Sequence, residues 1–308
     1  MKPLRAAAAF AVLAGAPALA GDSVVGGPPR PPLEAALLFK LAARVDAVDA
    51  GLDGVLGVAI KDLSTGATIS LRPDLVFPQA SSIKLAVLYE LFRQAGEGRL
   101  DLAEVTAPDA RRVAGDGVLY LLGPQVRLTW RDLAVLMMAL SDNEAANLLI
   151  ERVGMAAVNA RLDGLGLGAT RLRRLMMDVE AAGRGEENVS TPAQMLRLLE
   201  AMRAGTGLSE AGRRDMLALA SLPKESPFRS VLPPGLTVAD KPGDLEGVRC
   251  VSALVELPRR PYAAAVMATH LRRDADGEAA IRDLSTALLE TFDRLDRASA
   301  LGRIVSDR

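Results

Sequence analysis

The chain has 308 residues, a net charge of −1 at pH 7 and only 3% aromatic residues. This balance argues against a nucleic-acid-binding protein, which needs a basic surface to displace counterions from phosphates. A single cysteine, Cys250, excludes an internal disulfide, and a single histidine, His270, argues against a zinc site and a Ser-His-Asp triad. We therefore expect no metal, no organic cofactor and no nucleic-acid partner.

The N-terminus has the composition of a targeting segment. It begins with MKPLR, continues with an alanine-rich apolar stretch, and places the small residues Ala18 and Ala20 before Gly21. This order is typical of a secretory signal peptide, which we predict over residues 1–20; a buried helix is the alternative. No later apolar run is long enough to span a bilayer. We therefore expect a periplasmic or secreted protein without a membrane span once the signal is removed.

Hydrophobic periodicity indicates how the rest of the chain folds. It predicts a helix in LEAALLFKLAARVDAV, a hairpin in GVLGVAIKDL and TISLRP, and mostly helices from residue 81 to about 220. Strand patterns return in LTVADKP, RCVSALVEL and PYAAAVMATHL, before a last helix. Strands at both ends predict an α/β (α+β) fold, with an antiparallel sheet flanked by helices and an inserted all-helical lobe. We expect one domain over 21–308, with the α/β lobe at about 31–78 and 236–308 and the helical lobe at about 79–235.

Lysine is rare in this chain, because 31 of its 37 basic residues are arginines. Arginine keeps its proton in proteins, whereas a buried lysine gives it up readily. Lys84 lies three residues after Ser81 in QASSIKLAVLYEL, at the start of a predicted helix, where residues i and i+3 share a face. A neutral lysine in this position activates a serine nucleophile without a histidine. The alternative is that Ser81 or Ser82 caps the helix.

Two more segments carry polar residues at connections between predicted elements. The first, LSDNEAANLLI, places Ser141 and its two neighbours between helices, where a capping box of Ser141 with Glu144 is the alternative. The second, VADKPGDLEGVR, places Lys241 at the end of a strand. Gly243 in this segment allows close backbone approach to a ligand, although the K-P-G sequence alone indicates only a turn.

Together the three segments resemble the signature of class A β-lactamases and penicillin-binding proteins. That signature is S-x-x-K opening a helix, S-D-N between helices and K-[ST]-G on a later strand. The resemblance runs from about residue 31 to the end, and FPQASSIK, SDNEAANLL, ATRLRR and STPAQM are similar to class A segments. It implies a serine hydrolase whose partner is a small-molecule β-lactam or a peptidoglycan stem peptide. We expect this protein to be a monomer.

The resemblance also implies roles for the motif residues. Ser81 attacks the substrate carbonyl to form an acyl-enzyme, and Lys84 accepts or relays its proton. Ser141 passes a proton to the departing nitrogen. Lys241 assists Ser141 and attracts the substrate carboxylate. These four residues form the set needed for acylation.

The remaining implied contacts concern substrate binding. Asn143 holds the amide side chain of the substrate, and Asp142 stabilises the loop. The backbone N–H of Asp244, which follows Gly243, joins that of the nucleophile in an oxyanion hole. Arg249 is a second candidate anchor for the substrate carboxylate.

The chain departs from the family pattern at two places. Class A enzymes free themselves from the acyl-enzyme with a loop glutamate, and Met176 stands at that position here. Asn188 stands near the aspartate that usually pairs with the loop arginine, Arg174. Asp178 is the candidate replacement as water activator; the alternative is that it is a solvated loop charge. Pro242 replaces the family's Ser or Thr and supplies neither a hydroxyl nor an N–H.

These observations leave three functions open. The leading one is a β-lactamase of the class A type with an atypical deacylation loop. The first alternative is a D,D-peptidase, that is, a penicillin-binding peptidoglycan amidohydrolase on the same fold. The second is a non-catalytic binding protein. The presence of both Ser81 and Lys84 argues against this second alternative.

Overall fold

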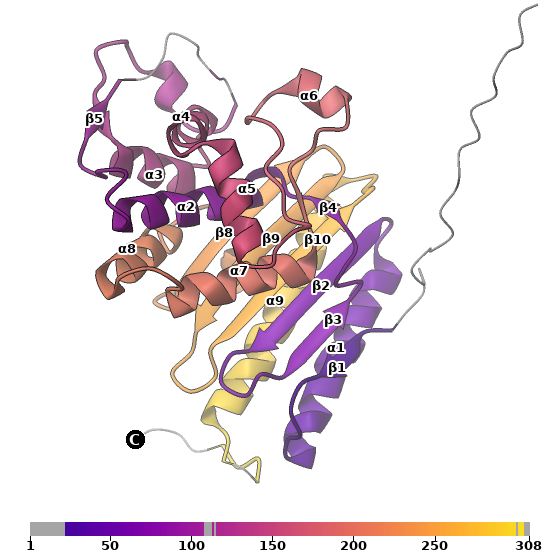
Figure 1. Ribbon diagram of the computed structural model, residues 1–308. Coiled ribbons are helices and arrows are strands. Elements are labelled where there is room, and N and C mark those ends of the chain that lie inside the picture. The colour runs from indigo at the N-terminus through magenta and orange to yellow at the C-terminus, as the bar shows by residue number, and fades with distance from the viewer. Residues whose placement is uncertain (1–21, 108–112, 114, 300, 305–308) are drawn as a thin grey trace, which may run out of the picture.

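An antiparallel sheet forms the centre of the molecule (Figure 1). The computed structural model describes residues 22–107, 113, 115–299 and 301–304, and within them the sheet has six strands in the order β1-β3-β2-β10-β9-β8. Each neighbouring pair is antiparallel. The strands are β1 (Val24–Gly26), β2 (Val55–Asp62), β3 (Thr68–Leu71), β8 (Thr237–Leu245), β9 (Val248–Glu256) and β10 (Tyr262–Thr269). Strands from both ends of the chain thus share one sheet, as predicted.

The central strand β10 is buried on both faces. Along it, Tyr262, Ala264 and Val266 belong to one buried cluster, while Ala263 and Met267 belong to another. Successive side chains of a strand point to opposite faces of the sheet, so each cluster takes alternate residues. This double burial explains why PYAAAVMATHL reads as an almost continuous apolar run rather than an alternating one.

Helices cover both faces of the sheet. The first and last helices, α1 (Pro32–Gly51) and α9 (Asp274–Arg297), contact each other and cover one face. On the other face α7 (Pro192–Ala204) contacts β2, β9 and β10. The predicted antiparallel sheet flanked by helices is therefore confirmed.

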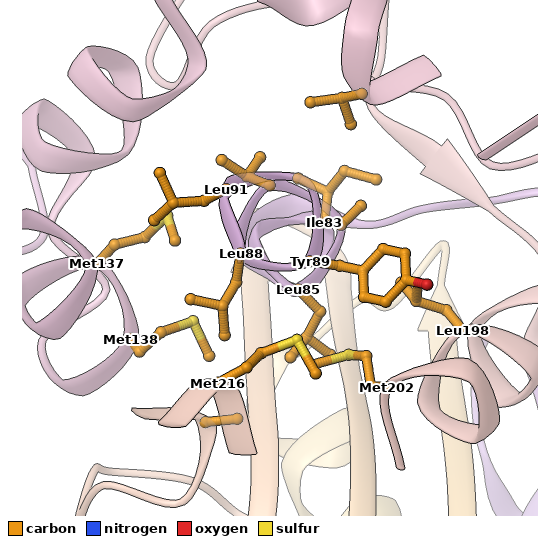
Figure 2. Packing of buried hydrophobic residues seen from close by; sticks show 14 of the residues in the cluster. Ile83, Leu85, Leu88, Tyr89, Leu91, Met137, Met138, Leu198, Met202 and Met216 are labelled. Carbon is orange, nitrogen blue, oxygen red and sulfur yellow. The ribbon is translucent and has the colours of Figure 1, made fainter. Parts of the chain in front are cut away.

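A group of helices contacts α2 (Lys84–Gly96), which runs through the middle of the group (Figure 1). They are α3 (Trp130–Ala139), α4 (Asn143–Val153), α5 (Met155–Gly164) and α8 (Glu210–Ala220), while the short helix α6 (Val179–Gly183) lies apart from this group. Figure 2 shows Leu85 and Leu88 of α2 facing Met138 and Met216 of its neighbours. A helix that is apolar nearly all round has to be buried, and this burial fixes the N-terminal end of α2 relative to the sheet.

Short elements connect these layers. The strands β4 (Phe77–Pro78) and β7 (Val189–Ser190) pair with each other, as do β5 (Val105–Thr106) and β6 (Leu128–Thr129). Three 3-10 turns are η1 (Ala80–Ile83), η2 (Leu119–Leu121) and η3 (Arg229–Val231). The expected signal peptide, residues 1–20, lies outside the described residues. Of the helices within those residues, none is long and apolar enough to cross a membrane.

Candidate active site

Ser81 lies on the 3-10 turn η1, directly before α2, and not in the first turn of an α-helix as the sequence suggested. Ala80 has a φ of +43°, a strained value for a residue with a side chain. The turn is fixed on both sides, because Gln79 N–H donates to the Asn188 carbonyl at 2.8 Å and Ser82 Oγ to Ser252 Oγ at 3.2 Å. Neither η1 nor α2 has a side-chain cap, so the capping alternative for Ser81 and Ser82 finds no support.

Gly243 brings strand β8 against this turn. A methyl group added at Gly243 would lie 2.6 Å from the Gln79 carbonyl oxygen and 2.8 Å from the Ser82 amide nitrogen. Such distances exclude a side chain. The close approach that the sequence suggested for Gly243 is therefore an approach to the backbone around Ser81.

Two buried lysines meet at one serine hydroxyl. Lys84 Nζ lies 3.1 Å from Ser141 Oγ, and Lys241 Nζ lies 3.1 Å from the same oxygen. Lys84 also donates to the Ser141 carbonyl at 2.6 Å and to Asn143 Oδ1 at 2.9 Å. Residues from α2, the α3–α4 connection and β8 are thus joined through Ser141. Among the described residues, no hydrogen bond joins the side chains of Ser81 and Lys84, although the Lys84 backbone N–H donates to the Ser81 carbonyl; side-chain contacts of catalytic groups are commonly incomplete before substrate binds.

Burial makes both amines weaker bases. It is the main cause that lowers the pKa of Lys84 well below its usual value, and the charge of Lys241 lowers it further. Burial also lowers the pKa of Lys241 to about 8. Both amines therefore give up a proton more readily than a lysine in water, and such a pair is suited to accepting and supplying protons.

The S-D-N segment is held by its aspartate. Asp142, not Ser141, is the N-cap of α4, since its Oδ1 accepts from Ala145 N–H at 2.9 Å. Its Oδ2 accepts from the N–H groups of Val118 and Leu119 at 2.7 and 2.8 Å. The capping-box alternative for Ser141 is therefore wrong. Ser141 instead has a φ of +55° at the connection between α3 and α4.

The loop from residue 171 to 190 carries Met176 against α4. Asn147 fixes the Met176 backbone from both sides, accepting from its N–H at 2.7 Å and donating to its carbonyl at 3.1 Å. Asn188 accepts the backbone N–H of Arg174 at 3.1 Å, while the Arg174 guanidinium pairs with Glu187 at 2.9 Å. From the resemblance we expected an acidic partner of Arg174 near position 188. The residue that pairs with Arg174 is instead Glu187, one position earlier.

Asp178 caps the short helix α6, where its Oδ1 accepts from Ala181 N–H at 2.9 Å. Its side chain also lines a cleft of about 480 Å³, which includes Ser81, Asn143 and Asp244 among its walls. The structure therefore brings Asp178 to the cleft that holds the expected nucleophile, with one carboxylate oxygen already used as a cap.

Arg249 does not join this group. Its guanidinium lies 3.2 Å from Asp274 and 3.4 Å from Glu278, and it donates to the carbonyl oxygens of Leu245 and Val248. It lines a second cavity, of about 610 Å³, and is absent from the walls of the cleft that contains Ser81. The motif that suggested Arg249 as an anchor does not include Asp274 and Glu278 of α9. The sequence therefore gave no indication that these two acidic residues pair with Arg249.

The backbone carbonyl oxygen of Pro242 accepts a hydrogen bond from Lys241 Nζ at 3.1 Å. Strand β8 is at the edge of the sheet, where a missing N–H is tolerated.

Asp116 lines the cleft beside Ser81 and Asn143, and the sequence analysis did not identify it. Its carbonyl accepts the N–H of Asn143 at 3.1 Å. The only sequence feature that could have indicated Asp116 is the Gly-Asp-Gly segment in which it lies, in front of two predicted helices.

Comparison with known proteins identifies the family. A model described as "Beta-lactamase enzyme family" matches residues 40–292 of this chain. The chain belongs to the β-lactamase enzyme family. The curated β-lactamase AST-1 of Nocardia asteroides is 28% identical over 232 residues, covering 73% of this chain and 75% of the relative.

Solved structures with this fold include β-lactamases and a penicillin-binding protein. An ancestral class A β-lactamase is 28% identical, with a TM-score of 0.76 over 82% of this chain and 100% of the other. A mutant of PBP-A, as an acyl-enzyme complex with penicillin G, is 26% identical, with a TM-score of 0.76 over 83% and 97%. The predicted class A-like fold is confirmed, and this β-lactamase family member is a serine hydrolase acting on β-lactam amides.

Proposed function

We propose that the mature protein, residues 21–308, is an exported monomeric enzyme that forms an acyl-enzyme at Ser81 and hydrolyses β-lactams with an atypical deacylation loop. The observation that supports this most directly is the Ser141 hydroxyl, which lies 3.1 Å from the amines of both Lys84 and Lys241. An ordinary structural serine does not need two buried amines, since each loses solvation on burial.

Acylation follows from this arrangement. As substrate binds, the Ser81 hydroxyl turns toward uncharged Lys84, which takes its proton while Ser81 Oγ bonds to the lactam carbonyl carbon. The lactam C–N bond then breaks, and the nitrogen receives a proton from Ser141 Oγ. The Lys84 ammonium returns that proton to Ser141. The products of the step are a serine ester, a free ring amine and neutral Lys84.

Substrate binding uses the groups around this relay. Asn143 lies at the cleft wall and holds the substrate amide, while Lys241 attracts the substrate carboxylate. The backbone N–H groups of Ser81 and Asp244 stabilise the oxyanion, a contribution of about 3 kcal/mol per donor in comparable enzymes. Both residues line the same cleft, which supports their pairing.

Deacylation is the slow step in this proposal. The buried Met176 can neither accept a proton nor orient water. Asp178 remains the candidate activator because it lines the cleft, and only its Oδ1 is used for capping. We therefore expect slow hydrolysis of the ester.

A D,D-peptidase activity on peptidoglycan stem peptides is the second candidate. The same acylation groups serve a peptide carbonyl, and Met176 leaves water poorly activated. The likeness to PBP-A, 26% identical with a TM-score of 0.77, supports this alternative.

Two reagents separate these functions. Purified mature protein is mixed with a chromogenic cephalosporin and, separately, with a fluorescent penicillin, with Ser81→Ala as the matched control. Continuous colour change supports the β-lactamase, and a persistent fluorescent label without turnover supports the peptidase. If neither signal differs between the protein and Ser81→Ala, acylation at Ser81 is refuted.

A further inference from the structure

Carboxylates surround the cleft that contains Ser81. Two of them are engaged: Glu187 pairs with Arg174, and Asp178 caps α6. The cleft has three more acidic wall residues, Asp116, Asp244 and Glu246, and all three are exposed. Within the described part of the chain, none of these three side chains has an ion pair or a hydrogen bond.

The loop holds Asp116 at the cleft by its two flanking glycines. Gly115 and Gly117 have φ values of +126° and +102°, which residues with side chains rarely adopt. A methyl group at Gly115 would lie 2.9 Å from Asn143 Nδ2, and one at Gly117 would lie 2.2 Å from Asp142 Oδ2. The loop is therefore clamped against the start of α4, and Asp116 cannot move away easily.

Asp244 and Glu246 come from a different part of the chain, the end of β8 and the turn to β9. The loop carrying Met177 and Val179 supplies an apolar part of the same cleft, and these two side chains are 51% and 74% exposed. A bound acyl group therefore meets apolar side chains together with free carboxylates.

Among the described residues, the cations beside the cleft do not neutralise these carboxylates. Lys84 and Lys241 are buried and held by Ser141, and Arg174 is paired with Glu187. The charge of Asp116 nevertheless acts on both lysines, since it partly opposes the lowering of their pKa values, of which burial is the main cause. Unpaired charges of one sign along a cleft create a field that selects ligands by charge.

We propose that this cleft selects substrates whose acyl group carries an ammonium ion beside an apolar group, and disfavours acyl groups that carry an anion. The proposal rests on the acylation of Ser81 proposed above. Asp116 and Glu246 are the specificity-determining residues, because they are free carboxylates from two loops of the cleft wall.

Three penicillins that share a phenyl group test the preference. Ampicillin carries an ammonium on the acyl group, benzylpenicillin carries no charge there, and carbenicillin carries a carboxylate. Acylation rate constants are measured by competition with a fluorescent penicillin at low ionic strength. We expect ampicillin to acylate about tenfold faster than carbenicillin, with benzylpenicillin between them, as charge complementarity in a cleft allows.

Two substitutions and one control complete the experiment. Asp116→Asn and Glu246→Gln should each narrow the ampicillin-to-carbenicillin ratio, and 0.5 M salt should narrow it in the parent protein. Glu290→Gln removes a carboxylate from the exposed surface of α9 and should leave the ratio unchanged. Equal rates for the three penicillins, or faster acylation by carbenicillin, would overturn the preference alone. Failure of all three to acylate would overturn the proposed function, and the preference with it.

Discussion

Asp142 offers a quantitative test of how the site is assembled. It is fully buried and its carboxylate accepts three backbone N–H groups, from Ala145, Val118 and Leu119. In Asp142→Asn, the amide oxygen can still cap α4 through Ala145. The amide NH2 group then faces the two N–H donors of the loop and cannot accept from them.

The expected cost follows from these contacts. Hydrogen bonds to a charged acceptor contribute about 1.5–3 kcal/mol each, so losing two should lower the free energy of unfolding by about 3–6 kcal/mol. With a urea m-value of about 3 kcal/mol/M, the midpoint of unfolding falls by at least about 1 M. Acylation by a fluorescent penicillin should slow as well, because the loop that carries Asp116 loses its attachment to α4.

Asp178→Asn is the matched control for this prediction. Asp178 caps one N–H of a five-residue helix, and Asn caps about as well as Asp, so its free energy of unfolding should change by less than about 0.5 kcal/mol. If Asp142→Asn unfolds at the same urea concentration as the parent protein, the buried carboxylate does not hold the loop, and the argument for a clamped Asp116 is wrong.

Three further predictions concern the reaction. Met176→Glu should shorten the acyl-enzyme lifetime about 100-fold, because a glutamate can act as the general base for water. Met176→Gln should leave the lifetime unchanged. Equal lifetimes for the two variants would refute the assignment of position 176 to the deacylating glutamate. Asp178→Asn should lengthen that lifetime, measured by loss of the fluorescent label, and an unchanged lifetime would exclude Asp178 as water activator. Because burial lowers the pKa of Lys241 to about 8, its charge is present at pH 7 and lost as the pH rises through 8. The kcat/KM for acylation by benzylpenicillin should therefore fall above pH 8 in the parent but not in Lys241→Met, and an identical fall in the variant would contradict this role.

Some of this site could be predicted from sequence because motif residues lie next to predictable elements. Ser81 and Lys84 precede an apolar helix, and Lys241 lies on a strand, so their convergence follows from the topology. Arg249 shows the limit of that reasoning. Its pairing with Asp274 and Glu278 depends on how α9 packs against β9, which no local pattern reveals.

The loops were harder to predict for a related reason. Asp116 is a common residue type in a glycine-rich loop, and only the clamp onto Asp142 gives it a position in the cleft. The helix at Ser81 was predicted, but the 3-10 turn that precedes it depends on contacts with β8 and β9 across the sheet edge. Local periodicity carries no information about such contacts.

The most direct measurement is peptide mass mapping of the protein after reaction with benzylpenicillin. The account predicts a single penicilloyl adduct on the peptide containing Ser81, and its absence in both Ser81→Ala and Lys84→Arg, because a guanidinium cannot take the hydroxyl proton. The folding of Lys84→Arg is checked by its urea midpoint. An adduct on another residue, or an undiminished adduct in a folded Lys84→Arg protein, would contradict the claim that a neutral lysine activates this serine.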